Sequence, residues 1–230
     1  MTLAGDGRNK TVGIVTIGQA PREDVIPDMA ELMGAGAQIL EGGALDGLRR
    51  DEIERLAPEG DHEVLVTRLT DGSAVFVAKE KITPLVQRRI DELEAAGAAV
   101  TVVLCTGAFK GLRAARTLVT PEKVLVGVLR GVSFPGKLGV ICPSKRHVPQ
   151  TTARWKGHGF DPVVVSLSPY KHGSDAVDVT PFRTEGVGLV LLDCMGFQRK
   201  ARQALQAELG VPLIVANLLV ARVVGEMLGE

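Results

Sequence analysis

The chain has 230 residues, 45% of them hydrophobic and 23% charged, so it is long and apolar enough to bury one large core or two smaller ones. Its 27 basic residues balance its 27 acidic ones, and only 3% are aromatic, which disfavours nucleic acid and anionic lipid as partners. No apolar run approaches the length of a membrane-spanning helix, and the N-terminal MTLAGDGRNK lacks the apolar centre of a signal peptide, so we expect a cytoplasmic protein with no membrane partner.

Short β-branched runs alternate with segments of helical period along the first part of the chain, as in a parallel sheet with crossover helices. The run 11–17 predicts a buried strand, and Pro21 predicts the start of a helix over 21–33. A short strand, AQILEGG, and a short helix, LRRDEIERLA, follow. The segment at about 62–79 alternates around Asp71-Gly72, and this dipeptide between alternating runs predicts a β-hairpin.

The alternation of strands and helices continues to the C-terminus. A helix over 81–96 precedes the strand AAVTVVL, and Cys105 lies at the carboxyl end of that strand. After Pro121 the pattern begins again. KLGVICPSKR predicts a strand, a loop and the start of a helix, and DPVVVSLS and GVGLVLLD predict strands. The helix GFQRKARQALQAELG follows, and PLIVAN then passes at Asn217 into a closing helix.

The two parts of the chain repeat one pattern. Each opens with a strand that contains a glycine, Gly13 or Gly139, and each later places Cys-x-Gly after another strand. These two features lie further apart in the first part, so the hairpin looks like an insertion there. The repeat therefore predicts an α/β protein with two similar parallel-sheet domains.

We expect the first domain to cover 1–120, including the hairpin insertion, and the second to cover 121–215. We expect the closing helix, 216–230, to pack back on the first domain. Open parallel sheets bind ligands beyond the carboxyl ends of their strands, so a ligand-binding cleft is expected between the two domains.

Cys105 and Cys194 are the candidate catalytic residues. A thiol at the start of a helix meets unpaired backbone N–H groups, which lower its pKa from about 8.5 and make it a competent base. Two such sulfurs across a cleft could remove a proton from a carbon next to a carboxylate and return one to the opposite face, which is racemisation without a cofactor. A cysteine that only fills space in the core is the common alternative for either one.

Other residues near the predicted strand ends are candidates for binding the substrate. Charge that develops on a carboxylate needs fixed hydrogen-bond donors, and the backbone of both Cys-x-Gly turns can supply them. A glycine lets the backbone approach a ligand closely, an arginine offers a bidentate fork, and an amide can donate. The candidates are Gln19, Arg22, Arg68, Thr106, Gly107, Met195, Gly196 and Asn217, and each could also serve local structure alone.

Asp193 directly precedes Cys194 and could orient a substrate ammonium group or tune the thiol, although neighbours on a strand alternate faces. We interpret Cys142 as structural, at the place that corresponds to Ile17 or Gly18 in the other domain. The cysteines and the four histidines, among them His172, have no metal-ligand spacing, and the chain contains neither GxGxxG nor a Walker loop. We therefore expect no metal and no cofactor.

Four stretches, VGIVTIGQAPR, LVTRLTDG, LLDCMGF and VANLLVAR, resemble the AroM family, and the resemblance covers nearly the whole chain. That family is grouped with the aspartate/glutamate/hydantoin racemase superfamily. The resemblance implies two flavodoxin-like domains related by a pseudo-twofold axis, with the active site between them. Racemases of the superfamily carry one catalytic cysteine in each domain, and the resemblance places Cys105 and Cys194 at those positions. Their patterns Cys-Asn-Thr and Gly-Cys-Thr are replaced here by Cys-Thr-Gly and Asp-Cys-Met-Gly.

Three functions stay open at this point. The paired cysteines favour a cofactor-independent, PLP-independent racemase or epimerase of an amino acid or related small carboxylate. In the superfamily, maleate isomerases use paired cysteines differently and arylmalonate decarboxylases keep only one, so a cis-trans isomerase or a decarboxylase of a small dicarboxylate is the alternative. A non-catalytic metabolite-binding protein is the third. For all three we expect a small carboxylate-bearing ligand, no nucleic acid partner and, as the commonest oligomer, a homodimer.

Overall fold

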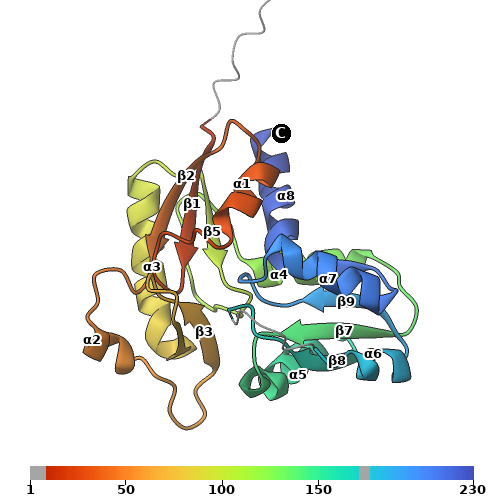
Figure 1. Cartoon of the computed structure of the whole chain (residues 1–230). Coiled ribbons are helices and arrows are strands. Elements are labelled where there is room, and N and C mark those ends of the chain that lie inside the picture. Colours follow the sequence, from red (N-terminus) through yellow and green to blue (C-terminus); the bar gives the residue numbers. More distant parts are fainter. Residues whose placement is uncertain (1–8, 171–176) are drawn as a thin grey trace, which may run out of the picture.

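The computed structural model describes residues 9–170 and 177–230 (Figure 1). The N-terminal MTLAGDGRNK lies mostly outside these described residues. His172 also lies outside them. Within the described part of the chain, no helix combines the length and the apolar character that crossing a membrane requires.

Two four-stranded parallel sheets form the framework, which confirms the predicted α/β class with parallel sheets. The first sheet has the order β2-β1-β5-β6, formed by β1 (Thr11–Thr16), β2 (Gln38–Gly43), β5 (Val100–Leu104) and β6 (Thr117–Val119). The second has the order β8-β7-β9-β10, formed by β7 (Lys137–Cys142), β8 (Pro162–Ser166), β9 (Val187–Leu192) and β10 (Leu213–Val215). Numbered within its own part of the chain, each sheet has the same strand order, as expected from the sequence repeat. A pseudo-twofold axis stays a prediction.

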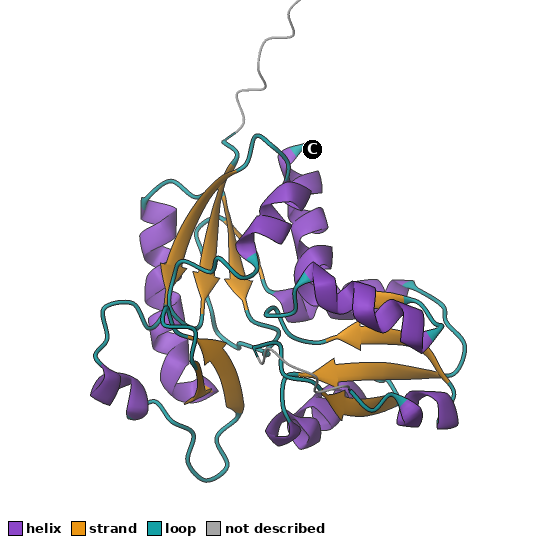
Figure 2. Ribbon diagram, viewed as in Figure 1, coloured by secondary structure: helices purple, strands orange, loops and turns teal. Residues whose placement is uncertain are grey.

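Helices cover both faces of each sheet, because the central strands are apolar on both sides. On the first sheet, α3 (Lys79–Ala95) covers one face, and α1 (Ile26–Met33) and α8 (Ala216–Leu228) cover the other (Figure 2). The helices of the second part are α4 (Pro121–Gly131), α5 (Val148–Gly157), α6 (Thr180–Thr184) and α7 (Arg199–Leu209), with one 3-10 turn at Lys145–His147.

The segment 64–78 forms an antiparallel hairpin of β3 (Val64–Arg68) and β4 (Ala74–Ala78). Gly72 in its turn has a φ of +85°, which glycine adopts without strain. The short helix α2 (Arg50–Glu54) precedes it. The side chain of Gln150 on α5 bonds to both backbone groups of Val64, with Nε2–O 2.7 Å and N–Oε1 3.1 Å, so the hairpin is fixed to the second part of the chain.

The closing helix, α8, follows the second sheet in the chain but packs against the first sheet. α8 packs on α1 and α4, and its Val220 and Val224 join one buried cluster with Met29 of α1, Val102 of β5 and Leu191 of β9. One apolar core therefore connects both sheets.

The predicted helix start at Pro21 is wrong, because α1 begins at Ile26. The carbonyl of Arg22 accepts hydrogen bonds from the N–H groups of Val25 and Ile26, which forms a separate turn before the helix. Pro27 is the proline in the first turn of α1.

Candidate active site

The strands of both sheets point their carboxyl ends toward the region between the sheets (Figure 2). Cys105 follows the last residue of β5, and Cys194 lies just beyond the end of β9. In the strand register, the residue paired with Gly13 lies four positions before Cys105, and the residue paired with Gly139 lies four positions before Cys194. The two cysteines therefore occupy equivalent positions in the two sheets.

Both cysteines line one cavity of about 50 Å³. We call residues 105–107 the Cys105 turn and residues 194–196 the Cys194 turn, and every residue of both turns lines this cavity. Thr67 and its neighbours on β3 add to the wall, so the hairpin is part of the site. The predicted residues Thr106, Gly107, Met195 and Gly196 thus lie together with the two cysteines.

The Cys-x-Gly motif has the same local structure in both turns. The backbone N–H of Gly107 donates to Sγ of Cys105, and that of Gly196 donates to Sγ of Cys194, both at 3.4 Å. These bonds favour a charged sulfur, but each thiol is desolvated. Burial raises the pKa of Cys105 to about 12 and that of Cys194 to about 11, and the Gly N–H groups offset only part of the increase.

The sequence-based expectation of thiolates at helix starts is therefore wrong. No helix occurs in 105–116, and α7 begins only at Arg199. Each sulfur nevertheless has an arginine whose charge lowers its pKa, Arg154 for Cys105 and Arg22 for Cys194. Negative charge on Cys194 raises the pKa of Cys105, as expected for two sulfurs in one cavity.

Arg154 on α5 connects the two cysteine turns. Its guanidinium donates to the carbonyl of Thr106 and to Oδ2 of Asp193. Oδ2 also accepts a hydrogen bond from Nε1 of Trp155 at 2.9 Å. The hydroxyl of Thr106 donates to the carbonyl of Asp193 at 3.1 Å, so the Cys105 turn is also bonded directly to the residue that precedes the Cys194 turn.

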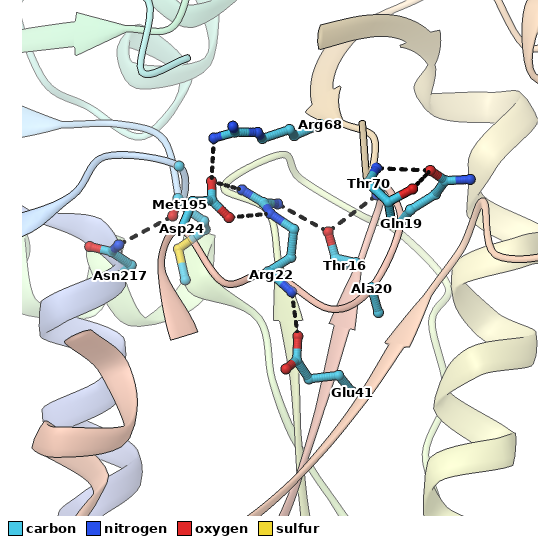
Figure 3. Close-up of polar contacts among 12 residues, drawn as sticks. Thr16, Gln19, Ala20, Arg22, Asp24, Glu41, Arg68, Thr70, Met195 and Asn217 are labelled. Carbon is cyan, nitrogen blue, oxygen red and sulfur yellow. Dashed lines mark hydrogen bonds and ion pairs between the residues drawn. The ribbon is translucent and has the colours of Figure 1, made fainter. Parts of the chain in front are cut away.

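Arg22 lines the cavity, and its fork already holds a carboxylate (Figure 3). Nε and Nη2 donate to the two oxygens of Asp24 at 2.8 and 2.9 Å, and Nη1 donates to Oγ1 of Thr16 at 3.2 Å. Burial would raise the pKa of Asp24, but Arg22 and then Arg68 hold it below its usual value. Arg22 is 4% exposed and stays charged, because Asp24 outweighs the cost of its burial.

Three predicted substrate-binding residues do not line the cavity. Oε1 of Gln19 accepts from the N–H and the hydroxyl of Thr70 at 2.9 and 3.0 Å, which fastens the hairpin to the loop after β1 (Figure 3). Arg68 forms an ion pair with Asp24, with 3.7 Å between Nη1 and Oδ2. Their contact with a substrate stays a prediction.

Asn217 is the third of these residues, and its side chain bonds to the backbone of the Cys194 turn (Figure 3). Fully buried at the start of α8, it donates from Nδ2 to the carbonyls of Met195 at 3.2 Å and Phe197 at 2.7 Å. Its Oδ1 accepts from the N–H of Leu218 at 2.8 Å. The two bonds from Nδ2 position the turn, and the bond from Leu218 holds the amide of Asn217 within α8.

Cys142, at the end of β7, does not line the cavity. Its thiol donates to the carbonyl of Ser144 at 3.4 Å. With Gly139 matched to Gly13, its position corresponds to Thr16, one residue before the predicted place. Among the described residues, no group of three or more His, Cys, Asp or Glu side chains could hold a metal ion.

The polar residues of the cavity wall that sequence reasoning missed include Glu63, Thr67, His147, Arg154 and Tyr170. Nδ1 of His147 lies 2.8 Å from Oγ of Ser144, and burial, reinforced by the charge of Arg154, lowers the pKa of His147 to about 4. Burial also raises the pKa of Tyr170, whose ring lies 5.8 Å from the guanidinium carbon of Arg22. Each is isolated in the sequence, so no spacing could have identified it.

Solved structures with this fold include three enzymes of different reaction types. Allantoin racemase from Klebsiella pneumoniae matches with a TM-score of 0.63 and 14% identity, over 96% of this chain and 88% of that one. An unliganded arylmalonate decarboxylase matches with a TM-score of 0.63 and 15% identity, over 96% and 93%. Maleate isomerase Iso from Pseudomonas putida S16 matches with a TM-score of 0.61 and 12% identity, over 95% and 92%.

The chain therefore has the same fold as these enzymes. The family model described as AroM protein matches residues 12–228, so the chain belongs to the AroM family, as its sequence motifs predicted. A sequence comparison with curated proteins finds no match.

Proposed function

We propose that the protein is a cofactor-independent racemase or epimerase of an amino acid or a related small carboxylate, with Cys105 and Cys194 as its two bases. One observation carries the proposal: two cysteines at equivalent positions of two sheets line the same cavity, each with the same Gly N–H bond to sulfur. A cysteine that only fills space would have no reason to recur in this way.

The reaction balances as two proton transfers. A thiolate takes the proton from the α-carbon, so the C–H bond breaks and an S–H bond forms. The thiol on the opposite face gives its proton to the planar carbanion and becomes the thiolate. Arg154 and Arg22, which already lower the pKa values of Cys105 and Cys194, are the cationic groups that stabilise the charge developing on the substrate carboxylate.

The raised pKa values mean that both sulfurs are thiols at neutral pH in the empty cavity. A cationic group on the bound substrate would lower the pKa of the nearby sulfur and so provide the base. Substrate binding would then activate the site, and the free protein would have little thiolate to lose to alkylation or oxidation.

The test is racemisation and α-proton exchange in deuterium oxide, followed by NMR and chiral chromatography on amino acids, hydantoins and hydroxy acids. Replacing either base by serine, as Cys105→Ser or Cys194→Ser, should lower racemisation by a factor of at least about 100. Cys142→Ser is the matched control, because Cys142 lies outside the cavity, and it should retain the activity. Full activity in either active-site variant would exclude the two-base mechanism.

The likeness to a maleate isomerase and an arylmalonate decarboxylase supports the alternative, a cis-trans isomerase or a decarboxylase of a small dicarboxylate. Fumarate formed from maleate, or carbon dioxide released from disubstituted malonates, would identify it. Tight binding without any turnover would identify a metabolite-binding protein.

A further inference from the structure

The carboxylate of Asp193 has one oxygen with two donors and one with none. The side chain is fully buried, and Oδ2 accepts from both Arg154 and Trp155. Oδ1 has no hydrogen-bond partner among the described residues. A buried carboxylate oxygen without a donor is costly, so native structures seldom contain one outside a functional site.

Thr67 on β3 supplies a second unpartnered polar atom. Its side chain is almost fully buried, and Oγ1 has no hydrogen-bond partner among the described residues. Asp193 and Thr67 line the same cavity as the two cysteines, one from the second sheet and the other from the hairpin. The residues of the cavity wall thus include one buried oxygen that can only accept and one buried hydroxyl that can donate or accept.

The charges around the cavity balance. Two arginines and two carboxylates line it, and all four are in ion pairs: Arg22 with Asp24, Arg154 with Asp193, and Glu63 with Lys79. His147 is neutral at pH 7 because burial lowers its pKa to about 4. A ligand with no net charge is therefore favoured over a dianion, whose second carboxylate would also be repelled by Asp193.

We propose that Asp193, assisted by Thr67, receives an ammonium group on the α-carbon of the substrate, so that the site selects small zwitterionic amino acids over hydroxy acids and dicarboxylates. This inference rests on the proposed function, because it takes the cavity as the active site. A cavity of about 50 Å³ is small, which favours small amino acids such as alanine over those with long side chains. The ammonium would also be the cationic group that favours a thiolate at the neighbouring Cys194.

Ligand chemistry alone can test the proposal on the unmodified protein. Alanine, lactate and propionate share one carbon skeleton and differ in the group on the α-carbon. Calorimetric titration should give alanine a Kd at least about tenfold below those of lactate and propionate, with malonate and maleate weaker than alanine. Trp155 is the one tryptophan of the chain and bonds to Asp193, so its fluorescence should change with alanine.

The variant Asp193→Asn gives the second test. Its amide oxygen can still accept from Arg154 and Trp155, while its NH₂ replaces the free oxygen and turns an acceptor into a donor. Alanine should then bind at least about tenfold more weakly, with little change for propionate. Glu63→Gln is the matched control, because it removes the same charge from the same wall, and it should change alanine binding by less than about threefold.

The proposal is overturned if lactate, malonate or maleate binds as tightly as alanine, if Asp193→Asn leaves alanine binding unchanged, or if no compound of the panel binds. The comparison of ligands on the unmodified protein tests the proposal even if the Asp193→Asn variant does not fold. Alanine binding that depends on Asp193 without α-proton exchange would contradict the proposed racemisation alone. Exchange of a hydroxy acid that requires both cysteines would contradict this inference alone.

Discussion

The Cys105 turn and the Cys194 turn present the same sulfur with the same Gly N–H bond, but different structures support them. Cys105 is half-buried and packs in the cluster formed by α3 and the hairpin. Cys194 is buried, and the turn around it is held by Asn217 at the start of α8. A repeated motif can thus keep the position of a reactive atom while different neighbouring elements hold each copy of the motif in place.

The strongest expected contrast concerns the residues that hold the two regions. Asn217→Leu removes three hydrogen bonds and leaves buried backbone groups without partners, so it should lower the free energy of unfolding by about 2–4 kcal/mol. Gln19→Leu removes the more exposed bonds to Thr70 and should cost less than about 1 kcal/mol. Urea unfolding measures both, and equal losses would show that α8 does not give the Cys194 turn special support.

The two glycines of the motif should differ in a smaller but measurable way. A Cβ added at Gly196 would lie 2.7 Å from the hydroxyl of Tyr170 and 2.9 Å from two of its ring carbons, so Gly196→Ala should cost about 1–3 kcal/mol. A Cβ at Gly107 would lie 3.1 Å from a terminal methyl of Leu65, which can move. Gly107→Ala should therefore lower the thermal midpoint less than Gly196→Ala, and the reverse order would contradict this account of the cavity wall.

The smallest contrast is in the two thiols. A raised pKa keeps a thiol neutral, so below the pKa the rate of alkylation by iodoacetamide should rise about tenfold for each pH unit. Both profiles should still rise at about pH 10, since the two pKa values are about 11 for Cys194 and about 12 for Cys105, and Cys194 should carry the larger fraction of thiolate at each pH. Peptide mapping by mass spectrometry after alkylation from neutral pH to about pH 10 measures both. A plateau below about pH 9 would instead indicate the lowered pKa expected of a helix start.

The sequence predicts the central strands well, because β1, β5, β7 and β9 are continuous apolar runs buried on both faces. It predicts the start of α1 poorly, since Pro21 and Pro27 are equally acceptable in a first helical turn. Only the burial of Arg22, which lies between the two prolines, distinguishes the two possible starts. Helix α5 has no strong apolar stripe, with Thr151 and Trp155 as its buried residues, so the sequence predicts a helix start near KLGVICPSKR but not the course of the helix.

The same limits apply to the candidate site. The Cys-x-Gly repeat pointed to both sulfurs, because a pattern that occurs twice is visible in one sequence. Arg154 and His147 come from α5 and the turn before it, and Thr67 comes from an inserted hairpin. Their place in the cavity depends on how the second sheet and the hairpin approach the first, which no local pattern encodes.

Helix α8 has a consequence for how the protein is made. A chain leaves the ribosome from its N-terminus, and one face of the first sheet stays incompletely covered until residues 216–228 have followed the whole second sheet. The apolar side chains of α1 pack on α8, which is separated from α1 by most of the sequence. We therefore expect both sheets to fold as one cooperative unit, and the pair of sulfurs to come together only when α8 has docked.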